Sequence, residues 1–362
     1  MQLSKVVESL EKLAPVHLAE PWDNVGLLAG DPDQKISRIL LTIDYTPSVA
    51  AEAADAGCDL VVAYHPPIFA PLKRLAPPSL VFDAIRRGIA IYSPHTALDA
   101  AEGGTNDMLA DAIGMSDRGP LRVGAGKATQ YKLTVFVPEE KVDQVGQALF
   151  EAGAGRIGNY TSCSFRNTGT GTFFGQEGTN PAVGQSGRLE RVPEVRLETV
   201  VPISKVSAVV YALRKSHPYE EPAFDLNVLA ARPQATGMGR IGKLAAIARQ
   251  DLLARIKREL QISHLLVAGP TGGNITRAAV CAGACGEFLD EAIAGGAQLY
   301  LTGEMRHHDA IKAARAGVTV VCTLHSNSER AVLKRVLTHL SEILGMPPVV
   351  ISAADHDPFT IL

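Results

Sequence analysis

The sequence has no excess of basic residues and no long uninterrupted apolar run. Lys and Arg total 35 against 38 Asp and Glu, a formal net charge of -3. Binding of nucleic-acid phosphates would therefore require a local basic patch. The longest apolar runs, such as 60–63 and 318–322, have the length of strands and fall far short of the roughly 20 residues of a membrane span. We expect neither an integral membrane protein nor a nucleic-acid binder.

The sequence is also poor in cysteine and in aromatic residues. It has five cysteines, an odd number, in a chain of 362 residues that is too long to need disulfide staples. We therefore expect free thiols and a cytoplasmic protein. Charged residues are interspersed among the apolar ones in 1–15, which predicts an amphipathic surface helix rather than a signal peptide. A hydrophobic fraction of 46% is enough for two or three buried cores.

Residues 36–109 alternate strand and helix signals. The expected strands are 39–43, 60–63 and 89–92, and the expected helices are 47–56 and 80–87. Thr46 is a suitable N-cap for the first helix, with Pro47 at its first position, and Gly57 and Gly88 end the two helices. This alternation predicts a parallel sheet with helices on its faces.

The same order returns in 277–350. The expected strands are 279–281, 298–301 and 318–322, and the expected helices are 287–294 and 309–315. Residues 55–62 can be aligned with 293–300, and 86–92 with 315–321. We interpret the pattern as an internal duplication, in which two related α/β halves form one domain with a crevice between their strand ends.

Residues 126–231 follow a different pattern and predict an inserted domain. The surrounding α/β domain is then discontinuous and comprises 1–125 and 232–362. The expected order β-α-β-β-α-β is the ferredoxin-like arrangement of an α+β domain. We expect a hairpin with strands at 160–167 and 172–175, and a polar connecting loop where glycines recur between 169 and 187.

Metal-capable side chains recur where the expected strands of the two halves end. They are His65, His95, Asp99, Glu304, His325 and Glu329. Ligands of open α/β sheets bind outside the carboxyl ends of the strands. The spacing His-x3-acid occurs in both halves and places an imidazole and a carboxylate on one helical face, so its recurrence favours a shared metal site over two unrelated ion pairs. Ligands of this kind suit Zn, Mn or Fe.

Other motifs are expected to have structural roles. Gly237-x-Gly239-x-x-Gly242 matches a dinucleotide-binding pattern, but 232–235 does not predict a strand and 243–245 is expected to be extended. Two prolines in 217–222 (HPYEEP) favour packing over metal binding. Cys281-x3-Cys285 lacks the second pair of a structural zinc site. His307 and His308 diverge by about 100° on a helix, so at most one faces the expected pocket.

Several segments together resemble the Nif-three-like family, which is also catalogued as GTP cyclohydrolase I type 2 homologs. The segments are WDNVGL at 22–27, Asp44, YHP at 64–66, HTALD at 95–99 with Gly104-x-Asn106 behind it, TGE at 302–304, and His325-x3-Glu329. The resemblance covers essentially the whole chain in order. Residues 126–231 are similar to the middle domain of longer bacterial members, which has a PII/CutA-like fold and contains a stretch like 217–222.

The resemblance implies a dinuclear metal centre in the cleft between the two halves. Its ligands would be His65, Asp99, His325 and Glu329, which would hold two divalent ions (Zn, Mn or Fe). Family members usually have a His-His pair where this chain has Tyr64 and His65. A neutral phenol is a poor zinc ligand, although a phenolate binds hard trivalent metals, so Tyr64 is a candidate ligand that could leave one metal position incomplete.

The resemblance further implies hydrolysis of a nucleotide or another phosphorylated small molecule by metal-activated water. His95 and Glu304 are not among the usual ligands of the family and are the candidates for proton transfer. The alternative is a non-catalytic, metal-binding regulatory or scaffold protein with an effector-sensing PII-like domain. By the same resemblance we expect a homo-oligomer, namely a ring-shaped hexamer.

Overall fold

The structure, a computed structural model, describes residues 1–123, 130–229 and 236–361. The chain divides into two compact units, which we call unit 1 (Met1–Ala125 and Pro233–Leu362) and unit 2 (Gly126–Arg232). The predicted domain boundaries, at 125/126 and 231/232, lie outside the described residues. Residues 232–235, for which the sequence predicts no strand, lie outside them as well.

A five-stranded sheet forms the first part of unit 1. Its order is β1 (Gly26–Ala29), β4 (Ala90–Ser93), β3 (Leu60–Ala63), β2 (Ile39–Thr42) and β17 (Val349–Ile351). β4, β3, β2 and β17 run parallel to one another, and β1 is antiparallel to β4.

Apolar residues of these strands are buried on both faces of the sheet. On one face they pack with α1 (Leu3–Leu13) and α12 (Val332–Ser341), and on the other with α2 (Pro47–Asp55) and α3 (Leu80–Arg86). α2 begins as the sequence predicts, because the side chain of Thr46 accepts a hydrogen bond from the N–H of Val49 and Pro47 occupies the first turn.

The second sheet of unit 1 has six strands. Its order is β13 (Leu266–Ala268), β16 (Thr319–Cys322), β15 (Leu299–Thr302), β14 (Asn274–Cys281), β12 (Arg240–Ala248) and β5 (Ser116–Gly119). β14, β15 and β16 are parallel. One face packs with α5 (Thr105–Ile113) and α8 (Arg249–Leu260), and the other with α9 (Leu289–Ala294) and α10 (His307–Arg315). Two-residue strands β6 (Arg122–Val123) and β11 (Gly237–Met238) pair beside these sheets.

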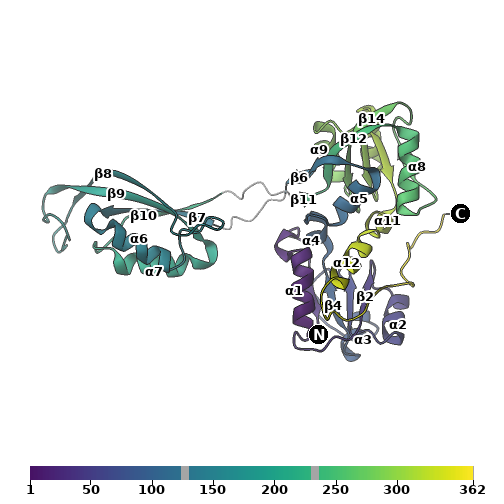
Figure 1. Cartoon of the computed structure of the whole chain (residues 1–362), viewed down its shortest axis with the longest axis horizontal. Coiled ribbons are helices and arrows are strands. Elements are labelled where there is room, and N and C mark those ends of the chain that lie inside the picture. Colours follow the sequence, from purple (N-terminus) through teal and green to yellow (C-terminus); the bar gives the residue numbers. More distant parts are fainter. Residues whose placement is uncertain (124–129, 230–235, 362) are drawn as a thin grey trace. The chain divides into compact units, whose positions relative to one another are not determined.

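The two halves of unit 1 repeat one order of elements. β2, α2, β3, α3 and β4 are followed by the short helix α4 (His95–Ala100), and β14, α9, β15, α10 and β16 by the short helix α11 (His325–Glu329). Figure 1 shows α4 and α11 between the two sheets of unit 1. The mixed α/β fold predicted from the alternating pattern is confirmed.

In its described residues, 130–229, unit 2 contains one sheet and two α-helices. The chain order is β7 (Gln130–Pro138), α6 (Val142–Glu151), β8 (Ser164–Phe174), β9 (Leu189–Pro202), α7 (Val206–Ser216) and β10 (Phe224–Val228). The sheet order is β10-β7-β9-β8, and all neighbouring strands are antiparallel. The apolar residues of the sheet and of the two helices form a core of their own.

The hairpin predicted within 160–175 is wrong. β8 is one continuous strand through Gly169 and Gly171, and it pairs with β9 from Ser164 opposite Thr199 to Phe174 opposite Leu189. A side chain at Gly171 would lie 2.0 Å from a carboxylate oxygen of Glu194. This glycine therefore makes room for a neighbouring side chain and does not form a turn.

In the described parts of the chain no helix combines the length and the apolar character needed to cross a membrane.

The glycine pattern Gly237-x-Gly239-x-x-Gly242 is followed by extended residues of β12 rather than by a helix, as the sequence predicts. A dinucleotide fingerprint requires a helix N-terminus there to bind the phosphates.

Candidate metal centre

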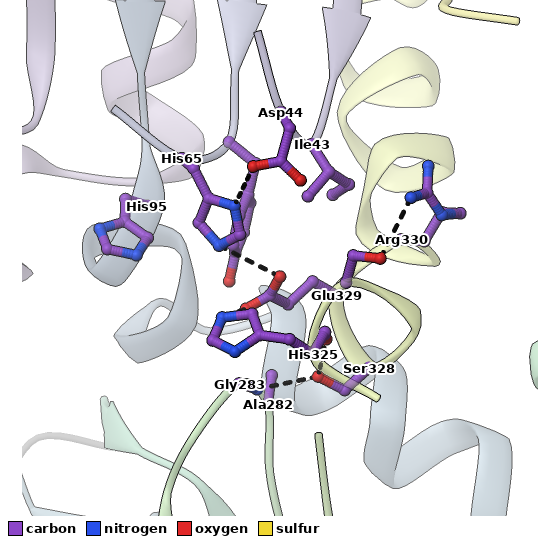
Figure 2. A network of polar contacts seen from close by, with 12 residues as sticks. Ile43, Asp44, His65, His95, Ala282, Gly283, His325, Ser328, Glu329 and Arg330 are labelled. Atoms are coloured by element: carbon purple, nitrogen blue, oxygen red, sulfur yellow. Dashed lines mark hydrogen bonds and ion pairs between the residues drawn. The ribbon is translucent and has the colours of Figure 1, made fainter. Parts of the chain in front are cut away.

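Three side chains with metal-binding atoms converge in unit 1. His65 follows β3, and His325 and Glu329 are the first and last residues of α11. One nitrogen or oxygen of each lies within 4.8 Å of those of the other two. His65 Nε2 is 3.3 Å from Glu329 Oε2, and His325 Nε2 is 3.3 Å from Glu329 Oε1. The two imidazole rings lie next to each other, and each presents a nitrogen to a different oxygen of one carboxylate (Figure 2).

The Glu329 carboxylate has the properties of a metal ligand. Its side chain is 3% exposed, and Oε2 accepts no hydrogen bond from the described residues. Burial raises the pKa of Glu329, but the imidazoles of His325 and His65 outweigh this effect and hold the pKa below its ordinary value. In the metal-free chain the two imidazoles compensate this buried charge, and a cation held by the carboxylate and both imidazole nitrogens could take their place.

Asp44 orients the ring of His65. It follows β2, and its Oδ1 accepts a hydrogen bond of 2.9 Å from His65 Nδ1, which leaves Nε2 for Glu329 or a cation. Burial lowers the pKa of His65, but the carboxylates of Asp44 and Glu329 outweigh it and raise the pKa to about 10. The same hydrogen bond lowers the pKa of Asp44.

The role of Asp44 could have been anticipated from the sheet topology. Thr42 of β2 pairs in parallel register with Ala63 of β3. Asp44 and His65 each stand two residues beyond those positions, so they leave the same edge of the sheet side by side. Sequence reasoning noted Asp44 as a motif residue but gave it no role.

A glycine loop holds α11 in place. The N–H of Gly283 donates to Ser328 Oγ at 2.8 Å, and this hydroxyl donates to the carbonyl of His325 at 2.7 Å. Gly283 has φ +76°, and a side chain there would come within 3.1 Å of Glu329 Oε1 and 3.6 Å of His325 Nε2. Glycine is thus needed both for the backbone conformation and for the space beside the candidate ligands.

A partly buried ion pair lies at the other end of α11. The Arg330 guanidinium donates to Asp355 Oδ2 at 2.8 Å, and the same oxygen accepts the N–H of Ile43 at 2.7 Å. Because Ile43 follows β2 directly, this network joins α11 to the strand end that carries Asp44 (Figure 2).

Asp99 and Tyr64 pair with each other. The Tyr64 hydroxyl donates to Asp99 Oδ1 and lies 3.3 Å from Thr105 Oγ1. Burial raises the pKa of Asp99 to about 6, and burial together with the charges of Asp99 and Glu329 raises the pKa of Tyr64 well above its ordinary value. The structure brings His65, His325 and Glu329 together, whereas Asp99 and Tyr64 lie outside that group.

His95 is oriented by Asp23. His95 Nδ1 is 2.8 Å from Asp23 Oδ1, and the N–H of Thr96 donates to Asp23 Oδ2 at 3.1 Å. Burial raises the pKa of Asp23, but these hydrogen bonds outweigh it and lower the pKa. The His95 ring centroid lies 5.4 Å from that of His65, so His95 borders the three-residue group. Sequence reasoning assigned no role to Asp23.

Glu304 contacts the candidate ligand His325. His217, His307 and His308 have other surroundings. Glu304 Oε1 is 3.4 Å from His325 Nδ1, and its side chain is 47% exposed. His307 and His308 are both exposed at the start of α10. In unit 2, the buried His217 bonds to the carbonyl of Phe136 at 2.9 Å, which agrees with the predicted packing role.

The cysteines are not part of the centre. All five are free, as predicted. Cys285 Sγ donates to the carbonyl of Ala282 at 2.8 Å, and Cys281 and Cys285 are buried in the core beneath the second sheet.

Known proteins are similar in sequence over almost the whole chain. A protein of Halalkalibacterium halodurans named GTP cyclohydrolase 1 type 2 homolog is 38% identical, over 99% of this chain and 98% of its own length. The protein of the same name from Bacillus subtilis is 34% identical over 99% and 98%.

Solved structures agree in fold. A Bacillus cereus protein related to NIF3 matches with a TM-score of 0.75 and 33% identity, over 100% of this chain and 99% of that one. A Staphylococcus aureus protein matches with a TM-score of 0.81 and 25% identity over the same shares. The model of one family, Duf34/NIF3 (NGG1p interacting factor 3), matches residues 1–358, and the chain therefore belongs to the Duf34/NIF3 family.

Proposed function

We propose that the protein is a metal-dependent hydrolase that acts on a nucleotide or another phosphorylated small molecule. The observation that supports this proposal is the convergence of the buried Glu329 carboxylate with one imidazole nitrogen each of His65 and His325. His65, His325 and Glu329 would hold a divalent cation, and a set of nitrogen and oxygen donors suits Zn, Mn or Fe.

A cation bound there would supply Lewis-acid polarisation of the substrate and activation of water. A second cation, which the family resemblance implies, would require the Asp99 carboxylate. In this chain Asp99 Oδ1 already accepts a hydrogen bond from Tyr64, so Tyr64 opposes a second cation unless its hydroxyl moves away or ionises.

Two flanking residues are suited to proton transfer and positioning. His95 is held by Asp23 through Nδ1, which leaves Nε2 to take a proton from, or give one to, a substrate beside His65. Glu304 lies beside the imidazole of His325, with Oε1 3.4 Å from Nδ1. We assign His95 the proton transfer and Glu304 the orientation of His325.

The test is turnover by protein reconstituted with Zn, Mn or Fe, against a panel of nucleotides and phosphoesters. GTP belongs in the panel because relatives carry the name GTP cyclohydrolase 1 type 2 homolog. Glu329→Gln should abolish turnover and metal retention, while Glu221→Gln, an exposed carboxylate of unit 2, should change neither. Failure of every substrate with every metal would refute the proposal.

The second candidate is a regulatory or scaffold protein whose metal is structural. The hydrogen bond from Tyr64 to Asp99 favours it, because it occupies a carboxylate that a second metal would use. The order of elements in unit 2, β-α-β-β-α-β, supports a ferredoxin-like domain, and we propose a PII/CutA-like, effector-sensing role for this unit under either function.

Glu329→Gln, which alters a member of the three-residue group itself, also separates the two candidates. If the centre is catalytic, this variant loses turnover and keeps its assembly, which we propose to be a cytoplasmic homohexamer. If the centre is structural, the variant dissociates and has no turnover to lose. Light scattering and the substrate panel, applied to the same preparation, provide both readouts.

A further inference from the structure

Two exposed aromatic side chains are in contact near the candidate metal centre. Trp22 and Phe69 are 59% and 57% exposed. Their ring centroids lie 5.9 Å apart with an angle of 52° between the ring planes. Single exposed aromatic residues are common, but two that meet from separate loops form a surface that burial in the core does not explain.

The backbone beneath both rings is fixed by their neighbours in sequence. Asn24 Nδ2 donates to the carbonyl of Ile68 at 2.6 Å, which joins the loop of Trp22 to the loop of Phe69. The side chain of Asp23, next to Trp22, is fully buried and bonds to Thr96 and His95. The two rings therefore stand on an ordered base, which reduces the entropy lost when a ligand binds.

A continuous series of rings leads from this pair to the metal-capable group. The Trp22 ring lies 6.1 Å from that of His95, with the edge of one toward the face of the other. His95 lies 5.4 Å from His65, and His65 lies 5.3 Å from His325. A ligand that rests on the aromatic pair thus has its other end within reach of the candidate ligands.

We propose that Trp22 and Phe69 form a stacking platform for the planar heteroaromatic ring of a nucleotide whose phosphate lies toward His65, His325 and Glu329. This inference rests on the proposed hydrolase function and narrows its substrate from phosphorylated small molecules to those that carry a base. Stacking accepts any base, because every base has a π-face. Discrimination among bases must then come from other contacts.

The experiment uses the fluorescence of Trp22, which is the only tryptophan in the chain. The full chain is treated with a chelator, so that the result does not depend on metal, and titrated with GMP, AMP and ribose 5-phosphate. GMP and AMP should both quench the emission, and ribose 5-phosphate should not. Quenching of equal size by ribose 5-phosphate, or by none of the three, overturns the proposal.

Two variants test whether nucleotide binding depends on the aromatic pair. Phe69→Ala should weaken the apparent Kd for GMP by about 5- to 150-fold, the range of base-aromatic stacking. Tyr211→Ala, which removes a 70% exposed aromatic residue of α7, is the matched control and should leave the Kd unchanged. Equal affinity of wild type and Phe69→Ala contradicts the platform.

A second copy of the chain is the competing occupant of this surface. If Trp22 emission shifts on dilution, and Phe69→Ala dissociates the assembly without changing GMP binding, the pair is a subunit contact and the proposal is wrong.

Failure of the stacking platform is distinguishable from failure of the proposed hydrolase function. Quenching by nucleotides without any turnover refutes only the hydrolase, whereas equal turnover of ribose 5-phosphate and GMP without quenching refutes only the platform.

Discussion

At the scale of single residues, the chemistry of the candidate metal centre depends on the partners of two buried carboxylates. The oxygens of Glu329 face imidazole nitrogens, and one of them accepts no hydrogen bond from the described residues. The Asp99 carboxylate already accepts the hydroxyl of Tyr64. The first carboxylate is therefore the better candidate to ligate a cation, because a hydroxyl already donates to the second.

Tyr64→His should therefore increase the number of cations bound per chain. The imidazole offers a nitrogen ligand in place of a neutral phenol and releases Asp99 Oδ1 from its hydrogen bond. We expect the variant to bind one cation more per chain than wild type, as measured by elemental analysis after dialysis. Tyr64→Phe is the control, since it releases Asp99 but adds no ligand. Equal metal content in all three proteins would contradict this assignment.

The pH dependence of metal binding should report on His65. Although burial alone would lower it, the carboxylates of Asp44 and Glu329 raise the pKa of His65 to about 10, so its imidazole is protonated in the metal-free chain at neutral pH. A cation must displace that proton, and metal affinity should rise with pH up to about 10.

Asp44→Asn removes one of the two carboxylates that raise this pKa. The proton of His65 then leaves at lower pH, and the rise of affinity with pH should flatten in the neutral range. The affinity itself should fall by about 10- to 100-fold, because Asp44 also orients the ring. The measurement is the Kd for Zn²⁺ at a series of pH values. Parallel profiles for wild type and variant would show that Asp44 does not set the pKa.

At the scale of elements, the two halves place different residues at equivalent strand ends. Asp44 and Gly283 both stand two residues beyond the first parallel strand of their half, and His65 and Glu304 two residues beyond the second. The carboxylate of the first half and the glycine of the second both lie against candidate ligands. Asp44 accepts a hydrogen bond from the candidate ligand His65. Gly283 has no side chain and so leaves room for the candidate ligands His325 and Glu329 of α11.

Gly283→Ala should reduce metal affinity more than it reduces stability. Both Gly283 and Gly317 have positive φ, +76° and +74°, so alanine at either position costs about 1 to 2 kcal/mol of folding free energy. A side chain at Gly317 meets nothing within 4 Å, whereas one at Gly283 presses on Glu329 and His325.

Gly317→Ala is therefore the matched control for backbone strain. We expect the two metal-free variants to lose similar amounts of unfolding free energy, as measured in urea. Only Gly283→Ala should also lose Zn²⁺ affinity, by about tenfold or more, which is the scale seen when the surroundings of a metal ligand are disturbed. Comparable affinity losses in both variants would mean that strain, and not contact with α11, is responsible.

At the scale of the whole molecule, the insertion of unit 2 leaves unit 1 structurally complete. The chain leaves unit 1 at β6 and returns at β11, and these strands pair with Gly237 opposite Val123 and Met238 opposite Arg122. Unit 2 has its own core, separate from those of unit 1. The three described ligand candidates all belong to unit 1.

Replacement of residues 124–235 by a short glycine-rich turn should yield a folded unit 1. Paired antiparallel ends need only a tight turn to join them, so the deletion closes without strain. We expect cooperative thermal unfolding by circular dichroism and Zn²⁺ affinity within about threefold of the full chain, since the ligands are retained and distant changes have small effects. An aggregated or unfolded product would show that unit 2 is required for unit 1 to fold.

Much of the fold and part of the candidate site could be predicted from the sequence. Alternating strands and helices, the cap at Thr46 and the His-x3-acid spacing are local patterns, because propensity and side-chain period act over a few residues. The pattern failed at Gly169 and Gly171, which predicted a loop but lie in β8, since the pairing with β9 overrides local preference.

Local sequence patterns fix which side chains stand at the strand ends of the two α/β halves, because the strand period and the helix signals place them there. The hydrogen-bond partners of these side chains follow from the packing of distant segments. Asp44 lies 21 residues from His65, Asp23 lies 72 from His95, and Tyr64 lies 35 from Asp99. Hydrogen bonds between such distant residues depend on how sheets and helices pack. For that reason the same His-x3-acid spacing holds a candidate metal ligand pair in α11 and two separately engaged residues in α4.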